Sequence, residues 1–386
     1  MSEADDNGEL FDATEESVEL ELTGASFEGL LIQPADWTIG SLYTQIGRQI
    51  DLNPAFQRRN VWTDTAKSNF IESILVGIPI PQILLSSRAD KKNSYLVLDG
   101  KQRLLALKGF IENEFPLRKL RILRDLEGKK WQDIEGEEDW SDRLMNETQR
   151  TAVIKNWTNE KVLYEIFYRL NSGSVKLSPM ELRMSLHPGT FLKFIVEWTE
   201  ELSSLHTLLG KKKPDPRMSD VELSIRHLAF STGITPYNGD LKAFLDQTCV
   251  EFNDRFDNEE GYKQRIEGNL DDMTAAIRAG LDIFPNRTFC RKFSEGAYET
   301  RFNRAVFDVQ VGALANQDVR EAAVAGPERF RSVYEAVATR GDFTRSVEFA
   351  TKTPFATRTR FDLFYQAINQ EYGTDLETPN IQEGEQ

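Results

Sequence analysis

Hydrophobic positions in the first half of the chain repeat with two periods, one typical of strands and one typical of helices. Residues 95–98 form a short apolar run with aromatic and β-branched members, which predicts a buried strand. Residues 63–76 and 101–111 repeat with the period of a helix that has one apolar face, and Gly77 ends the first of these helices. The remaining runs predict a strand and a helix within 27–52 and strands near 82–86, 115–123 and 152–155.

The second half of the chain has mainly the helical period. Residues 178–181, Ser-Pro-Met-Glu, have the spacing of a capping box with proline at the first helical position, and Ser219 begins a similar pattern. Helical spacing recurs at 241–256, 266–281, 298–314 and 361–368. The sequence therefore predicts an α/β (α+β) domain at 27–189, followed by a mainly α-helical domain at 190–372.

Charge is distributed unevenly along the chain. The net charge is −15, but sixteen of the 62 Asp and Glu residues lie before Arg48 or after residue 370, where there is no lysine or arginine. The residues between hold 46 acids against all 47 bases, so this part is nearly neutral and can carry basic patches. We expect residues 1–26 and 373–386 to be acidic, solvated or disordered arms. The alternative for the first arm is that it covers a basic groove as a mimic of nucleic acid.

Composition argues against several classes of protein. No apolar run is long enough to cross a bilayer and the start lacks the features of a leader, so we expect a cytoplasmic protein without a membrane partner. The only cysteines, Cys249 and Cys290, cannot build a disulfide framework, and we expect two buried thiols. Three histidines, none at HxxxH spacing, offer little for metal or nucleophilic catalysis.

Candidate chemistry is concentrated where the strand at 95–98 meets the following helix. Gly100 allows a turn that a side chain would obstruct. The positive end of the helix and its N–H groups then lie beside Lys101, Gln102 and Arg103, an arrangement that suits a phosphate. Asp99 can cap the helix, hold a basic partner, or position a metal or water near a phosphate. A capped helix with solvated charges is the alternative.

Two other segments offer polar side chains for the same pocket. Gln57 and Arg58 lie between aromatic residues, which indicates either a structural cation–π corner or a guanidinium held for a phosphate. Arg169 and Asn171 end the helix that precedes the capping box. Polar side chains at that junction serve either helix capping or the second wall of a nucleotide pocket.

Four ordered blocks resemble the ParB/sulfiredoxin-like N-terminal domain of GmrSD-type, modification-dependent restriction endonucleases, a family built around a DGQQR-type motif. The blocks are PAFQRRNVW at 54–62, IESILVGIPIP at 71–81, VLDGKQRL at 97–104 and IFYRLNSGSVKLSPMELR at 166–183. Lys101 departs from the glutamine usual in the motif. A lysine there would strengthen phosphate binding, whereas the lost amide would alter the geometry for hydrolysis.

The resemblance implies a compact α/β domain that binds, and in several members hydrolyses, a nucleoside triphosphate in DNA restriction or phage defence. It implies that Asp99 and Gln102 are catalytic and that Asp99 is the Mg²⁺ ligand. The cofactors to be expected are a nucleoside triphosphate, whose base the sequence does not identify, and Mg²⁺. The expected nucleotide-binding residues are Gln57, Arg58, Gly100, Lys101, Arg103, Arg169 and Asn171.

Three functions remain open. As an enzyme, the protein would be a Mg²⁺-dependent nucleoside triphosphatase that acts with DNA or with an effector or nuclease protein. As a binding module, it would hold a nucleotide or a DNA end without turnover and switch an effector. A DNA nuclease on the ParB-like scaffold ranks third, because the sequence has no dense carboxylate cluster.

The second half bears on these alternatives in two ways. Members of the family commonly carry a C-terminal HNH nuclease domain, and because no histidine follows His227, we expect no intact HNH site. Basic residues of the helical domain could contact nucleic-acid phosphates, although charged helix faces usually contact only water. These residues are Lys211, Lys212, Lys213, Arg287, Arg291 and Lys292. An oligomer is compatible with each function.

Overall fold

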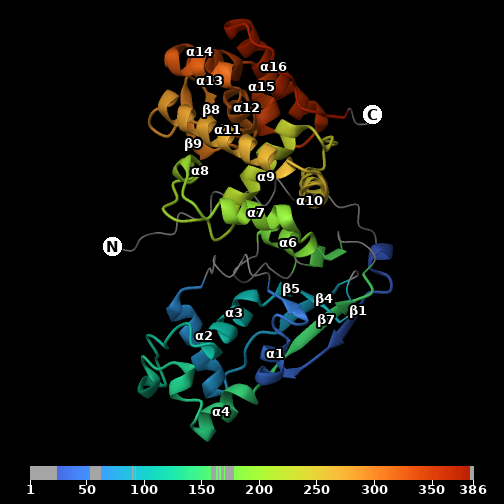
Figure 1. The fold of residues 1–386 in the computed structure, drawn as a ribbon, viewed down its shortest axis with the longest axis vertical. Coiled ribbons are helices and arrows are strands. Elements are labelled where there is room, and N and C mark those ends of the chain that lie inside the picture. The colour runs from blue at the N-terminus through green and yellow to red at the C-terminus, as the bar shows by residue number, and fades with distance from the viewer. Residues whose placement is uncertain are drawn as a thin grey trace. The chain divides into compact units, whose positions relative to one another are not determined.

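The computed structural model describes residues 24–52, 62–88, 91, 93–157, 162–163, 165–166, 169 and 178–382. The chain forms two compact units, which divide between Leu186 and His187. The first unit is α/β and the second is mainly helical, which confirms the predicted fold class (Figure 1).

A five-stranded mixed sheet is the centre of the first unit. Its strands are β1 (Leu31–Pro34), β3 (Ile50–Asp51), β4 (Ile83–Ser87), β5 (Tyr95–Asp99) and β7 (Thr151–Lys155), in the order β1-β7-β4-β5-β3. Strand β4 pairs in parallel with β7 and antiparallel with β5, and β3 pairs in parallel with β5. A separate pair joins β2 (Trp37–Thr38) to β6 (Thr148–Gln149). The strand predicted at 95–98 is therefore an interior strand of the sheet.

Both faces of this sheet contribute to hydrophobic cores. Side chains alternate along the strands, so Val97 of β5 faces one core while Leu98 faces the other. The first core includes apolar residues of helices on one side of the sheet, and the second includes Leu182. The helices of the unit are α1 (Ile39–Gln45), α2 (Asp64–Val76), α3 (Lys101–Ile111), α4 (Glu138–Met145) and α6 (Pro179–Leu186).

The helix boundaries confirm the capping signals of the sequence. The Thr63 hydroxyl accepts a hydrogen bond from the Ala66 N–H at the start of α2, and Gly77 ends that helix at φ 80°. In the capping box of α6, the Ser178 N–H donates to Glu181 Oε2 at 2.7 Å and the Glu181 N–H donates to Ser178 Oγ at 3.1 Å.

The strand predicted near 115–123 is wrong. The segment bonds instead to side chains of α2: the Ile122 and Leu123 N–H groups each donate to Glu72 Oε1 at 2.8 Å. Short 3₁₀ turns follow at Arg124–Leu126 and Trp131–Asp133. A side-chain carboxylate thus replaces the neighbouring strand as hydrogen-bond acceptor, which the alternation of apolar residues could not reveal.

Ten helices and one hairpin make up the described part of the second unit. The helices are α7 (Thr190–Trp198), α8 (Ser204–Leu208), α9 (Ser219–Thr232), α10 (Leu241–Asn258), α11 (Tyr262–Ile283), α12 (Arg304–Ala315), α13 (Gln317–Ala325), α14 (Pro327–Ala338), α15 (Gly341–Glu348) and α16 (Pro354–Tyr372). The hairpin joins β8 (Arg291–Ser294) to β9 (Ala297–Phe302). The prediction of one helix over 298–314 is therefore wrong in its first turn, because Asn303 caps α12 after the strand.

The segment after α16 is packed against the helical unit. The Tyr237 N–H donates to Asn380 O at 2.9 Å, and the Gln382 N–H donates to Tyr237 O at 2.8 Å. Ile381 is buried beside this contact. Residues 374–382 thus differ from the solvated arm expected of an acidic tail, because an apolar residue and backbone pairing fix them in place.

Cys249 and Cys290 are both buried free thiols, as predicted. Among the described helices, none is long and apolar enough to span a bilayer.

Candidate functional site

The turn between β5 and α3 has a backbone that requires glycine. Gly100 is at φ 96°, in the left-handed region, and an added Cβ would lie 2.9 Å from Ile83 Cγ1. The strand and the helix are consequently joined by one residue. The sequence signal for this turn was the Asp-Gly pair itself.

The start of α3 has no side-chain cap. Gly100, at the N-cap position, has no side chain to cap the helix, and the first turn of α3 contains no acidic residue. The first N–H group with an acceptor inside the element is that of Leu104, which donates to Gly100 O at 3.0 Å. A helix N-terminus without a side-chain cap presents N–H groups and a positive dipole end to an incoming phosphate.

Asp99 pairs with a basic partner rather than capping the helix. Its Oδ2 accepts from Arg103 Nη2 at 2.5 Å. The other guanidinium nitrogen, Arg103 Nη1, donates to the carbonyls of Gln82, at 3.1 Å, and Pro81. Arg103 therefore links the end of β5 to the segment before β4, and its side chain is only 9% exposed.

Lys101 is buried at the same helix start. Burial lowers the pKa of its amine to about 7, while the carboxylates of Glu181 and Asp51 act in the opposite direction. These acids come from the first turn of α6 and the end of β3. Three elements thus meet around a lysine whose charge changes near neutral pH. From the sequence, Glu181 was one of the polar residues at a junction that serves either helix capping or the second wall of a nucleotide pocket. Asp51 was missed, and its place at the end of an apolar strand segment was the available signal.

Gln102 connects the helix to the preceding segment. Its side-chain Oε1 accepts from the Trp62 N–H at 3.3 Å. Gln57, Arg58 and Asn171 lie outside the described residues. Arg169 is described, and its Nε pairs with Glu165 Oε1 at 2.5 Å.

Asp99 is the expected Mg²⁺ ligand, and among the described residues few other carboxylates lie near it. In the parts of the chain that the structure describes, no group of three or more His, Cys, Asp or Glu residues is placed to hold a metal ion. Mg²⁺ in nucleotide sites commonly takes one or two carboxylates together with phosphate oxygens and water. Asp99 offers one carboxylate, which fits that minimal pattern while sharing Oδ2 with Arg103.

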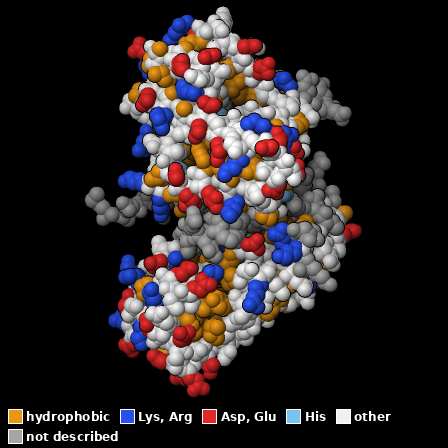
Figure 2. All heavy atoms as spheres, viewed as in Figure 1, with side chains coloured by type: hydrophobic (Ala, Val, Ile, Leu, Met, Phe, Trp, Pro, Cys, Tyr) orange, Lys and Arg blue, Asp and Glu red, His pale blue; other side chains and the backbone are white. Residues whose placement is uncertain are grey.

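Of the six candidate nucleic-acid residues of the second unit, three contact other groups of the protein and three are exposed. Lys211 Nζ lies 3.4 Å from Asp215 Oδ1, Lys292 pairs with Glu299 and Glu348, and Arg291 Nε donates to Thr300 O. Figure 2 shows basic and acidic side chains intermixed over the visible face. These contacts offset part of the positive charge that phosphate binding requires. Lys212, Lys213 and Arg287 are exposed.

Residues 39–188 match the model of one protein family, described as GmrSD restriction endonuclease, N-terminal domain. The matched range contains the β5–α3 turn, Lys101 and both acids beside it. Searches of curated proteins and of solved structures gave no match.

Proposed function

Because residues 39–188 belong to the GmrSD restriction endonuclease N-terminal domain family, we propose that the chain is a component of a DNA restriction or phage-defence system that binds a nucleoside triphosphate at the start of α3. The observation that carries the nucleotide part is the uncapped helix start behind Gly100, with Lys101 buried at its first position. A phosphate there would receive the peptide N–H groups and the lysine charge together.

Each residue of the turn has a distinct role in this proposal. Gly100 allows the tight turn that starts α3 directly after β5, and Lys101 supplies a cation whose pKa the phosphate would raise. Arg103 acts as a positioning residue, because its guanidinium already holds Asp99 and the carbonyls of Pro81 and Gln82. Gln102 is the amide available to orient a phosphate or a water.

The proposal also includes hydrolysis of the bound nucleotide. Mg²⁺ would neutralise phosphate charge when bound, with Asp99 as its protein ligand. Asp99 or Gln102 would then orient the water that attacks the terminal phosphorus. The mutual pairing of Asp99 and Arg103 favours a second candidate, in which the nucleotide is bound without turnover and switches a partner such as DNA or an effector protein.

Calorimetric titration with ATP, GTP, CTP and UTP in the presence of Mg²⁺ tests the site. We expect one or more nucleotides to bind, and Lys101→Met to weaken that binding at least tenfold at pH 6.5. The matched control is Lys108→Met, which removes a lysine near the other end of the same helix, where it pairs with Glu112. Thermal melting of each variant verifies folding.

Equal weakening by the two lysine variants, or no binding of any nucleotide, would overturn the proposal. Release of phosphate by wild type, lost in folded Asp99→Asn and Gln102→Ala variants, would establish turnover. Tight binding without release would leave the regulatory module as the function.

A further inference from the structure

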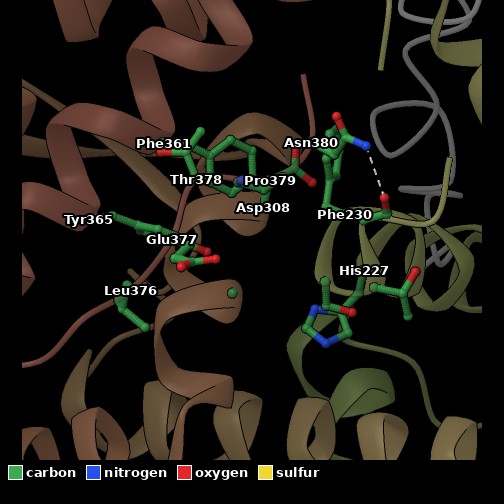
Figure 3. Close-up of a pocket in the computed structure, with 14 residues that line it drawn as sticks. His227, Phe230, Asp308, Phe361, Tyr365, Leu376, Glu377, Thr378, Pro379 and Asn380 are labelled. Carbon is green, nitrogen blue, oxygen red and sulfur yellow. Dashed lines mark hydrogen bonds between the residues drawn. The ribbon is translucent and has the colours of Figure 1, made fainter. Parts of the chain in front are cut away.

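The helical unit contains a cavity that has no part in the site described above. Its volume is about 410 Å³, within the range of small-molecule sites. Residues of α9, α12 and α16 line it, together with Leu376–Asn380, the segment that follows α16 (Figure 3). Three of the lining side chains, Phe230, Phe361 and Tyr365, are aromatic.

Two polar side chains of this lining are themselves buried. His227 is 5% exposed and Tyr365 is 6% exposed. Burial keeps both neutral, because it lowers the pKa of His227 to about 4 and raises that of Tyr365 well above its ordinary value of 10. A purely apolar ligand would cover the imidazole and the phenol without bonding to them, which is costly, so this lining favours a ligand that supplies donors and acceptors.

The charges around the cavity disfavour an anion. Asp308 and Glu377 are the charged residues of the lining. Asp308 is neutralised from behind by Arg226, whose Nε and Nη2 each donate to it at 2.6 Å, and by Arg360 Nη2 at 3.3 Å. Both guanidinium groups thus bond to Asp308 and neither arginine lines the cavity, whereas Glu377 adds a negative charge to the lining. A phosphate in the cavity would meet carboxylates instead of these cations.

The segment after α16 closes one side of the cavity. Asn380 Nδ2 donates to Gly233 O at 3.2 Å (Figure 3), the Thr378 hydroxyl donates to Asp362, and the Leu376 N–H donates to Asn369 Oδ1 at 2.7 Å. These bonds tie Leu376–Asn380 to the ends of α9 and α16. The cavity is therefore formed in advance of any ligand.

We propose that this cavity binds an uncharged, planar heteroaromatic molecule with hydrogen-bond donors and acceptors on its edge, the chemistry of a nucleobase in a free nucleoside. The aromatic side chains contact the ring, and His227 and Tyr365 bond to its edge. The site is independent of the nucleotide proposed at α3, because it selects against phosphate.

Titration with adenosine, cytidine and thymidine, followed by calorimetry and by saturation-transfer NMR, tests the inference, with the three 5′-monophosphates as comparison. We expect at least one nucleoside to bind and its monophosphate to bind at least tenfold more weakly. Tyr365→Phe should weaken nucleoside binding about tenfold, and thermal melting of the variant verifies that it folds. Ser231→Trp, at the exposed edge of the lining, should block binding by occupying the space.

The matched control is Tyr372→Phe. Tyr372 lies on the same helix and has a buried hydroxyl, but it does not line the cavity. Nucleoside binding should persist in this variant and in Lys101→Met. The inference fails if no nucleoside binds, if Tyr365→Phe and Tyr372→Phe weaken binding equally, if the monophosphate binds as tightly as the nucleoside, or if Lys101→Met abolishes nucleoside binding.

Discussion

Lys101 illustrates how the position of one side chain decides its chemistry. A lysine at a solvated helix start is permanently charged near neutral pH, but burial beside Glu181 and Asp51 brings the pKa of Lys101 to about 7. Its charge then depends on what else enters the site. A bound phosphate would add a further negative charge and would retain the proton on the amine.

Gly100 is the residue for which the structure makes the sharpest stability prediction. Gly100→Ala should lower the free energy of unfolding by about 2–4 kcal/mol, because alanine is strained at positive φ and its Cβ would meet Ile83. Urea denaturation measures the loss. The control is Gly136→Ala, at a glycine with open space around it and no positive φ, which should change the value by less than about 0.5 kcal/mol. Similar effects of the two variants would refute the requirement for glycine at position 100.

At the scale of elements, some side chains bond to backbone groups that would pair with a neighbouring strand in a sheet. Glu72 of α2 holds the segment that follows α3 by accepting the N–H groups of Arg121, Ile122 and Leu123. Burial raises the pKa of Glu72, but these peptide N–H bonds outweigh it and lower the pKa overall. Arg103 similarly holds the segment before β4, because its guanidinium donates to the carbonyls of Pro81 and Gln82.

Glu72→Gln should lower the free energy of unfolding by about 1–3 kcal/mol at pH 7, because an amide is a weaker acceptor for three peptide N–H groups. Hydrogen exchange at Arg121–Leu123 should accelerate in the variant, whereas exchange within α10 should not. Since the folded-state pKa of Glu72 is lowered, the difference between wild type and variant is present at neutral pH and shrinks as acid protonates the carboxyl. A constant difference down to pH 3 would contradict this role of the charge.

Local sequence spacing predicted those helices whose caps and apolar positions lie within the same segment of the chain. The helices predicted at 63–76 and from 178 have local caps at Thr63 and Ser178, the helix at 101–111 has a local apolar period, and all three predictions are confirmed. The strand expected at 115–123 failed because its acceptor, Glu72, lies about 50 residues away. For the same reason, the sequence could predict a polar turn at 99–103, but not the burial of Lys101 between β3 and α6.

At the scale of the whole molecule, the net negative charge lies at the two ends of the sequence, and the residues between them are nearly neutral. The helical unit nevertheless buries a group of charges, in which Asp308 joins Arg226 and Arg360. His227 lies close to this group and stays neutral at physiological pH. Composition alone could not predict such a group, because its members come from α9, α12 and α16.

His227 predicts part of the acid sensitivity of the molecule. Its pKa is about 4 when folded and should be about 6.5 when unfolded, so the unfolded chain binds an additional proton between these values. The free energy of unfolding should therefore fall as pH decreases from 6.5 to 4, by up to about 1.4 kcal/mol per pH unit from this residue. His227→Gln should remove that contribution, as measured by urea denaturation of both proteins between pH 4 and 8.

The difference in unfolding free energy between wild type and His227→Gln should be constant above pH 7, which serves as the internal control. Below pH 6.5 the variant should lose less stability than wild type. If the unfolding free energies of wild type and His227→Gln change in parallel over the whole pH range, His227 has the same pKa in the folded and unfolded chains.

Proton uptake during nucleotide binding tests the central claim most directly. Calorimetry at pH 8 in two buffers of different ionisation enthalpy, with the nucleotide that binds best, measures the protons taken up. Lys101 is mostly neutral at this pH, so a phosphate that raises its pKa should cause uptake of about one proton per nucleotide. Lys101→Met should take up none, while Lys108→Met should behave as wild type. Uptake unchanged in Lys101→Met would place the nucleotide away from the start of α3, and binding of nucleotide without any proton uptake would contradict a neutral Lys101 in the free protein.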